Sequence, residues 1–257
     1  MTDFSIETLA EGALFRIERP ARLNALTRAV MKGLADCIAD LESRRARLLV
    51  ITSAGERAFC AGTDLGELQG LTLDERRAKS DVSRDLLARL HRSSLVSVAA
   101  MNGLAYGGGL ELALACTLRI AAPHVTMSLP EVKLALVPAY AGTQLLPALI
   151  GRSRALEMML TGRAITTTEA LAIGLVHRLA NGDSPLVDQA IAFGREVTRW
   201  SPTAVAAIRA CINASSESLT DEGLAIEREQ VNTNYASEDS REGMAAFLEK
   251  RPPRFSR

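Results

Sequence analysis

The sequence is poor in aromatic residues, which make up 4% of its 257 positions. Proteins that stack bases or sugar rings use aromatic side chains, so this scarcity argues against such a surface. There is also no excess charge of either sign, because Lys and Arg together number 30, as do Asp and Glu. A nucleic-acid-binding protein is expected to be basic overall. We therefore expect no nucleic-acid partner, whereas a small anionic ligand held by a local cluster of charges remains open.

Cysteine and histidine are scarce as well. The four cysteines are widely spaced and form no C-x-x-C pair, which predicts buried apolar side chains in a reducing compartment. The three histidines have no paired spacing, so neither a metal site nor a Ser/His dyad is expected. Glu111 and Arg119 interrupt the most apolar segment before it reaches the about 18 residues of a membrane span. With no signal-peptide pattern at Met1–Phe4, the sequence predicts a soluble, cytoplasmic protein without a membrane partner.

The sequence does have the apolar content of a large core, with 47% hydrophobic residues. Short apolar runs alternate with segments of helical periodicity over the first hundred residues. Strands are expected at 13–17, 48–52 and 95–101, an amphipathic helix at 27–43, and a more polar helix at 73–92. This alternation predicts βαβ units with right-handed crossovers.

Strand patterns fade after about residue 140, and helix signals replace them. Thr166 and Glu169 have the spacing of a capping box, and Gly174 is typical of the end of that helix. Ser201-Pro202 predicts the start of a helix through Cys211, and further helices are expected at 219–231 and 240–250. The layout predicts an α/β core followed by a helical C-terminal part.

A glycine run, Gly107-Gly108-Gly109, lies between the strand at 95–101 and a helix expected at 110–118. Such a junction lets backbone N–H groups point at a ligand, with the positive end of the helix dipole behind them. Glu111 falls in the first turn of that helix. The run is not a P-loop, because no Lys-Ser/Thr follows, and Leu112 replaces the last glycine of a dinucleotide-binding motif.

A second turn of small residues, Phe59–Leu65, follows the strand at 48–52. Two N–H donors from two such turns make an oxyanion hole, in which each donor is worth ~3 kcal/mol. The alternative is two ordinary turns that merely require small residues. Glu131 follows Pro130 in an expected loop and, taken alone, reads as a surface residue. Taken alone, Glu111 reads as a charge that offsets the helix dipole. Together, two carboxylates beside two such turns are suited to acid–base catalysis on a carbonyl compound.

The set of motifs resembles the enoyl-CoA hydratase/isomerase (crotonase) family. The matching segments run in order over nearly the full length: Arg19-Pro20 with Asn24-Ala25-Leu26, Phe59–Leu65, Asn102–Glu111, Pro130-Glu131, Leu136-Val137-Pro138 with Gly142-Thr143-Gln144, Leu160-Thr161-Gly162, Ala170–Val176 and Glu242–Pro252.

The resemblance implies a fold, an assembly and a ligand. The expected fold is α/β, with a core of repeated ββα units that carries the acyl-CoA site over residues 1–195. A C-terminal helical region at 196–257 is expected to join subunits into a homotrimer, or a hexamer that is a dimer of trimers. The expected ligand is an acyl-coenzyme A thioester, with no cofactor apart from the coenzyme A of the substrate.

The resemblance also assigns roles to residues. Thr63 and Gly108 look like the residues whose N–H groups hold the thioester oxygen, and Glu111 and Glu131 resemble the two acid–base glutamates of hydratases. By the same resemblance Glu111 activates water and Glu131 protonates C2. Coenzyme A contacts are expected from residues that flank these motifs and from the C-terminal end: Arg22, Ala61, Asp64, Leu65 and Lys250.

The chain departs from the family pattern at a few positions. Tyr140 stands in a loop that is usually glycine-rich, and it adds bulk near the expected acyl and water site. Gly66 stands where many relatives carry a lysine that meets coenzyme A phosphates. The leading hypothesis is hydration of a 2-enoyl-CoA thioester. Three alternatives stay open: a double-bond isomerase, a thioester hydrolase, and a non-catalytic acyl-CoA-binding protein.

Overall fold

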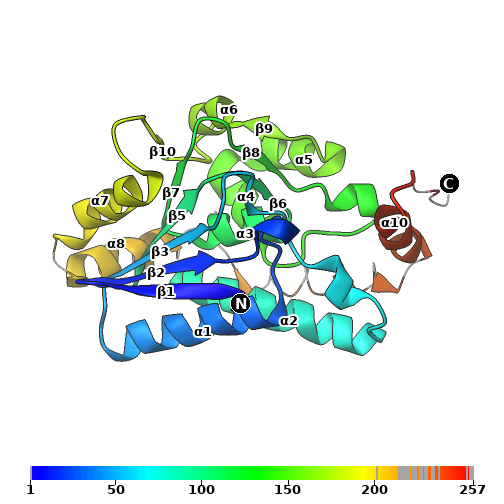
Figure 1. Ribbon diagram of the computed structural model, residues 1–257, viewed down its shortest axis with the longest axis horizontal. Coiled ribbons are helices and arrows are strands. Elements are labelled where there is room, and N and C mark those ends of the chain that lie inside the picture. Colours follow the sequence, from blue (N-terminus) through cyan, green and yellow to red (C-terminus); the bar gives the residue numbers. More distant parts are fainter. Residues whose placement is uncertain are drawn as a thin grey trace.

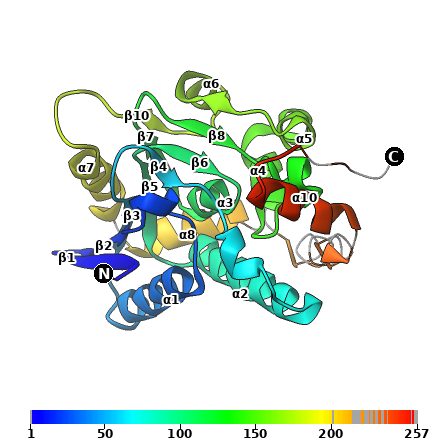
Figure 2. The same ribbon diagram turned by 45° about the vertical axis from the view of Figure 1, so that its right-hand side comes forward.

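The computed structural model describes residues 2–200, 202–213, 220, 221, 225, 228, 231, 232, 235, 236, 238–252 and 254. Two β-sheets lie between helices, with α7 and α10 at opposite ends of the molecule (Figure 1, Figure 2). None of the described helices is long and apolar enough to span a membrane.

The chain repeats a unit of two strands followed by a helix. The units are β1 (Phe4–Leu9), β2 (Gly12–Ile17) and α1 (Arg28–Ser43), then β3 (Leu48–Ser53), β4 (Ala58–Cys60) and α2 (Leu73–Arg92), then β5 (Val96–Met101), β6 (Leu104–Tyr106) and α3 (Gly108–Ala115), and finally β7 (Leu118–Ala121), β8 (Thr126–Ser128) and α4 (Gly142–Ile150). The large sheet has the order β1-β2-β3-β5-β7-β10, and the small sheet has the order β4-β6-β8-β9. From the second unit on, the first strand of each unit therefore joins the large sheet and the second joins the small one. The expected α/β fold of ββα units is confirmed.

The large sheet is covered on both faces, which explains its continuous apolar strands. From β2 to β7 the strands pair in parallel, and every residue of β3 and β5 is buried. Leu49 and Ile51 face the main core with α1, α2 and α3, whereas Leu48 and Val50 face α7 (Leu186–Thr198) on the other side. Parallel sheets buried on both faces read as unbroken apolar runs, as these do.

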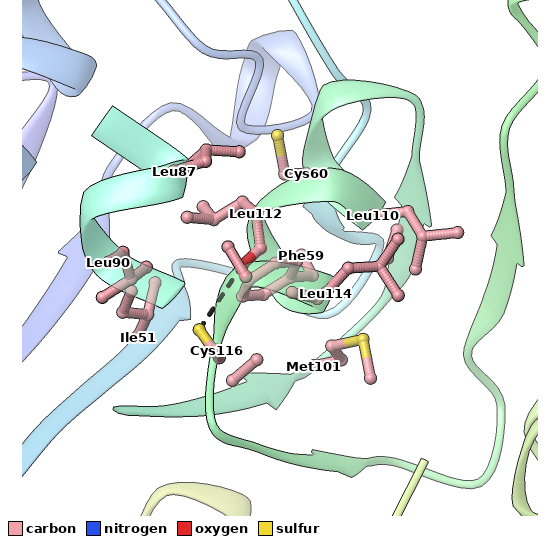
Figure 3. Packing of buried hydrophobic residues seen from close by; sticks show 14 of the residues in the cluster. Ile51, Phe59, Cys60, Leu87, Leu90, Met101, Leu110, Leu112, Leu114 and Cys116 are labelled. Atoms are coloured by element: carbon pink, nitrogen blue, oxygen red, sulfur yellow. Dashed lines mark hydrogen bonds between the residues drawn. The ribbon is translucent and has the colours of Figure 1, made fainter. Parts of the chain in front are cut away.

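Helix α3 lies in the centre of the main core, and all eight of its residues are buried. Figure 3 shows side chains from α2, β3, β4 and β5 around it, among them Leu87, Ile51, Phe59 and Met101. A short helix whose residues are apolar apart from one glutamate is stable only when it is enclosed in this way. The first turn of α3 is therefore a rigid platform in the interior.

The remaining elements surround this core: η1 (Pro20–Arg22), η2 (Leu65–Leu68), η3 (Glu131–Leu134), α5 (Arg152–Thr161), β9 (Ile165–Thr166), α6 (Thr167–Ala172), β10 (Arg178–Leu179), α8 (Pro202–Asn213) and α10 (Glu238–Leu248). Helix α10 packs directly on η3. The approach is so close that a Cβ placed on Gly243 would lie 2.2 Å from the carbonyl oxygen of Leu134. Helix α7 packs on the large sheet and extends to Thr198, past residue 195.

Several sequence predictions are confirmed, including the helices at 27–43 and 73–92 and the capping of α6 by Thr166, which accepts a hydrogen bond from the Glu169 amide. The cysteine prediction holds for Cys37, Cys60 and Cys116, which are buried and free, whereas the side chain of Cys211 lies outside the described residues. Ser201 and most of 219–231 also lie outside them.

Three predictions were wrong. The helix expected at 110–118 begins at Gly108 and ends at Ala115, because Leu118–Ala121 pair with β5 as β7. Glu131 begins a short 3-10 helix and does not lie in an open loop. Strands continue beyond residue 140, as β9 and β10, although both are too short to leave a periodic pattern.

Candidate active site

Two chain turns meet at the start of α3. Gly62 follows β4, has φ +105°, and a Cβ on it would lie 3.0 Å from the Tyr106 carbonyl oxygen and 3.3 Å from the Gly108 nitrogen. Gly109 is equally constrained, since a Cβ there would lie 2.1 Å from the Cys60 carbonyl oxygen. Glycine is required at both positions by close approach of backbone to backbone. The small-residue turn after β4 and the glycine run are thus packed directly against each other.

The amide of Thr63 is directed by pairing with Leu26. The Leu26 amide donates to the Gly62 carbonyl over 2.8 Å, and the Asp64 amide donates to the Leu26 carbonyl over 3.0 Å. In a parallel bridge the residue between the two bonded positions turns its own N–H and C=O to the opposite side. The Thr63 N–H therefore points away from Leu26.

The amide of Gly108 is the first of α3, so it has no partner within the helix. Gly107 precedes it with φ +52° and ψ −130°, a conformation that favours glycine. Within the described residues, no backbone acceptor takes the amide hydrogen of Thr63 or Gly108. Two N–H donors on adjoining turns, with the positive end of the α3 dipole behind one of them, suit a developing negative charge.

Glu111 lies in the first turn of α3 and is 2% exposed. Its Oε1 accepts hydrogen bonds from the backbone amides of Tyr140, at 2.8 Å, and Gly142, at 2.7 Å. A Cβ on Gly142 would lie 2.8 Å from the same oxygen, so a larger residue there would displace the carboxylate. Charge-assisted bonds from two amides hold this carboxylate in one place.

Glu131 reaches the glycine run through pairing of β6 with β8. The Gly107 amide donates to the Ser128 carbonyl over 3.0 Å, which ends the pairing close to residue 131. The Glu131 Oε1 would lie 3.0 Å from a Cβ on Gly107. The nineteen residues between Glu111 and Glu131 are thus folded back so that both carboxylates adjoin the segment 107–111.

Tyr140 packs over the same segment and is 3% exposed. A Cβ on Gly108 would lie 3.0 Å from both Cδ2 and Cε2 of its ring. Its hydroxyl accepts a hydrogen bond of 2.7 Å from Thr63 Oγ1. Burial raises the pKa of this phenol, and the neighbouring Tyr235 and Glu111 act in the same direction. The bulky departure seen in the sequence therefore faces the site.

Side chains of α2 and of the C-terminal part complete this wall, although none of them was among the predicted site residues. Ser83 lies beside the Tyr140 phenol and lowers its pKa, against the effect of burial, and Ser80 Oγ lies 2.7 Å from the hydroxyl of Tyr235. Both serines are 2% exposed although α2 is a polar helix. In the sequence, the only indication of their role is that two small hydroxyl residues stand three positions apart in a helix of mostly charged residues.

Four of the expected coenzyme A contacts lie along neighbouring segments. The Ala61 amide donates to the carbonyl of Leu23, the residue after the exposed Arg22, over 3.0 Å. Leu65 begins η2, whose start is capped by the Asp64 carboxylate at 3.0 Å from the Gly66 amide. The same carboxylate binds Arg19 Nη2 at 2.9 Å, so the Asp64 side chain holds the loop. Lys250 is exposed and lies in the turn just after α10.

Comparison with known proteins identifies the family. Residues 10–257 match the family model described as enoyl-CoA hydratase/isomerase. The short-chain-enoyl-CoA hydratase of Clostridium acetobutylicum is 34% identical over 96% of this chain and 94% of its own length. The crotonyl-CoA hydratase of Syntrophomonas wolfei is 33% identical over 95% and 94%. The crystal structure of carnitinyl-CoA hydratase from Mycobacterium avium superposes with a TM-score of 0.87 at 31% identity, covering 100% of this chain and 99% of that one. The chain belongs to the enoyl-CoA hydratase/isomerase family.

Proposed function

We propose that this chain is an enoyl-CoA hydratase, which adds water across the 2,3 double bond of a 2-enoyl-CoA thioester. The observation that carries the proposal is the convergence of Glu111 and Glu131 on the segment that presents the Gly108 amide. Relatives named as hydratases, matched over nearly their whole length, support the same activity.

The proposed reaction uses the two amides and the two carboxylates in one site. The thioester oxygen accepts hydrogen bonds from the Thr63 and Gly108 amides and takes up negative charge as water attacks C3. Glu111 removes a proton from the attacking water, and Glu131 delivers a proton to C2. The enolate electrons form the C2–H bond, and the thioester carbonyl is restored. No electron is gained or lost overall, so the reaction requires no redox cofactor.

The coenzyme A moiety is assigned to the edge formed by η1 and η2. Arg22 is exposed there beside the Ala61 turn, and the loop of Asp64 and Leu65 is stiffened by the ion pair with Arg19. Arg22 and Lys250 would supply positive charge for the phosphates in place of the lysine that many relatives carry at the position of Gly66.

We further infer a homotrimer, or a hexamer built from two trimers, joined by the region at 196–257, while residues 1–195 form the catalytic core. Exposed large apolar side chains support an assembly. Leu156 and Leu160 on α5 are 60% and 64% exposed, and Phe247 on α10 is 57% exposed. Buried free thiols at Cys37, Cys60 and Cys116 suit the reducing cytoplasm.

The test is to mix purified protein with crotonyl-CoA and follow loss of the conjugated thioester absorbance, with the product identified by mass spectrometry. The proposal expects a product heavier by one water with the thioester intact. Release of free thiol would indicate a hydrolase. Turnover of a 3-enoyl-CoA to the conjugated isomer without hydration would indicate an isomerase. Binding of coenzyme A without turnover of any of these would indicate a non-catalytic protein.

A further inference from the structure

Resting on the proposed function, we infer that Tyr140 is a specificity-determining residue, which closes the acyl pocket beside the reacting carbons and restricts the enzyme to short acyl groups.

Tyr140 contacts each functional group of the site, two of them through its ring and hydroxyl and one through its backbone. Its own amide binds Glu111 Oε1 at 2.8 Å, its Cδ2 and Cε2 cover the α-carbon of Gly108, and its hydroxyl reaches Thr63 Oγ1 at 2.7 Å. In the proposed reaction the thioester carbon sits at the amides of Thr63 and Gly108, and C3 sits near water on Glu111. The ring covers Gly108 and its hydroxyl reaches Thr63, while the Tyr140 backbone is fixed to Glu111, so in the proposed reaction the ring contacts the acyl chain close to C3.

The ring is also anchored at its far end. The Thr63 hydroxyl donates to the phenol oxygen, and Ser83 of α2 lies beside it. Behind this pair, Ser80 and Tyr235 form another hydroxyl contact of 2.7 Å. All three of Tyr140, Ser80 and Ser83 are at most 3% exposed. Moving the ring aside for a longer chain would break this buried hydrogen bond and leave a polar group unsatisfied, which is unfavourable.

A longer acyl chain would also contact a polar surface. Each additional methylene normally favours binding when it enters an apolar environment. Here the wall beyond the ring carries the hydroxyls of Ser83, Ser80 and Tyr235, which lose hydrogen bonds if methylenes replace their partners. Both the bulk of the ring and the polarity behind it disfavour medium and long chains.

The experiment measures the preference of the enzyme for acyl-chain length in two independent ways. Calorimetry gives the Kd of butanoyl-, octanoyl- and dodecanoyl-CoA, which cannot react, and kinetics gives kcat/KM for the 2-enoyl-CoA thioesters of the same lengths. For the wild type we expect both affinity and kcat/KM to fall by about 10–200-fold from the short chain to the long one. In Tyr140→Ala the preference should weaken or reverse by a similar factor.

Tyr140→Phe is the matched control, because it keeps the ring and removes only the hydroxyl. We expect it to retain the short-chain preference with a smaller ratio between short and long chains. Tyr140→Leu serves if the alanine variant does not fold, and circular dichroism checks each variant.

Equal wild-type affinity for butanoyl- and dodecanoyl-CoA would overturn the inference, as would an alanine variant with an unchanged length profile. If the wild type binds short chains selectively but hydrates none, the hydratase proposal fails and the pocket limit stands. The two failures are therefore distinguishable.

Discussion

The two glutamates of the site are held in opposite ways. Glu111 projects from a helix that is buried on all sides, and two backbone amides bind one of its oxygens. Glu131 projects from η3, a single short turn in which no residue is fully buried and which is supported from outside by α10. One carboxylate belongs to the centre of the core, and the other belongs to a peripheral layer folded over it.

The difference indicates which role each carboxylate suits. A group that positions water must stay fixed relative to the thioester, and the rigid setting of Glu111 does this. A group that delivers a proton to C2 must lie beside that carbon, and Glu131 is held next to Gly107 by η3, which packs on α10. We therefore expect changes near Glu111 to act on turnover, and changes behind Glu131 to act on both turnover and local stability.

Removing either carboxylate should have the largest effect. Glu111→Gln and Glu131→Gln each keep the shape of the side chain but cannot exchange a proton, so kcat for hydration should fall by about 100–10,000-fold in each. Steady-state kinetics with crotonyl-CoA checks this, and binding of butanoyl-CoA by calorimetry shows whether the pocket is intact. A fall of less than about tenfold in either variant would contradict the two-carboxylate account.

Displacing Glu111 without removing it should have the next largest effect. The Cβ introduced by Gly142→Ala would lie 2.8 Å from its Oε1, so the carboxylate must shift. Displacement of a catalytic group by about 1 Å costs about 100-fold in rate, and we expect kcat to fall by a comparable factor. Gly182→Ala is the matched control, because no atom lies within 4 Å of the added Cβ. Equal activity of the two variants would show that the position of Glu111 is not critical.

Loosening the support of Glu131 should have a smaller effect. Gly243→Ala places a Cβ 2.2 Å from the Leu134 carbonyl oxygen, which forces α10 away from η3. Overpacking of this kind typically costs about 1–3 kcal/mol. We expect a lower Tm and a kcat reduced less than in Gly142→Ala, measured by thermal unfolding and kinetics. A variant with wild-type Tm would show that α10 does not support η3.

The smallest expected effect is a loss of folding stability at acidic pH. It sets the pH range in which the activity of the two glutamates can be compared. Burial lowers the pKa of His91 from 6.5 to about 4, and the neighbouring cation of Arg209 acts in the same direction. The unfolded chain therefore binds this proton more readily than the folded one, so stability is complete above pH 6.5 and is lost as the pH falls toward 4.

Denaturant unfolding at several pH values measures this loss. Between about pH 6.5 and 5 the wild type should lose about 1–2 kcal/mol more than His91→Gln. An identical pH dependence in the two proteins would show that His91 does not titrate in this way. A loss of activity at acidic pH then reports protonation of the two glutamates only above the pH at which the protein begins to unfold.

The same contrast explains what the sequence could predict. The glycine run, the strand before it and the apolar residues after Glu111 are local signals, so the platform for Glu111 was predictable, although the helix ends at Ala115 because Leu118 starts a strand. The approach of Glu131 depends on β6 and β8, strands of three residues that leave no periodic pattern. The contacts of Ser80 with Tyr235 and of Thr63 with Tyr140 join distant segments, and no local pattern encodes them.

Exchange of the C2 hydrogens of butanoyl-CoA in heavy water is the most direct test of the central claim, that the two carboxylates have separate roles. This saturated ligand has no double bond to hydrate, so exchange reports only proton transfer at C2, and mass spectrometry measures it. We predict exchange in the wild type, its retention in Glu111→Gln and its loss in Glu131→Gln. Loss in Glu111→Gln together with retention in Glu131→Gln would contradict the assignment of water to Glu111 and of the C2 proton to Glu131.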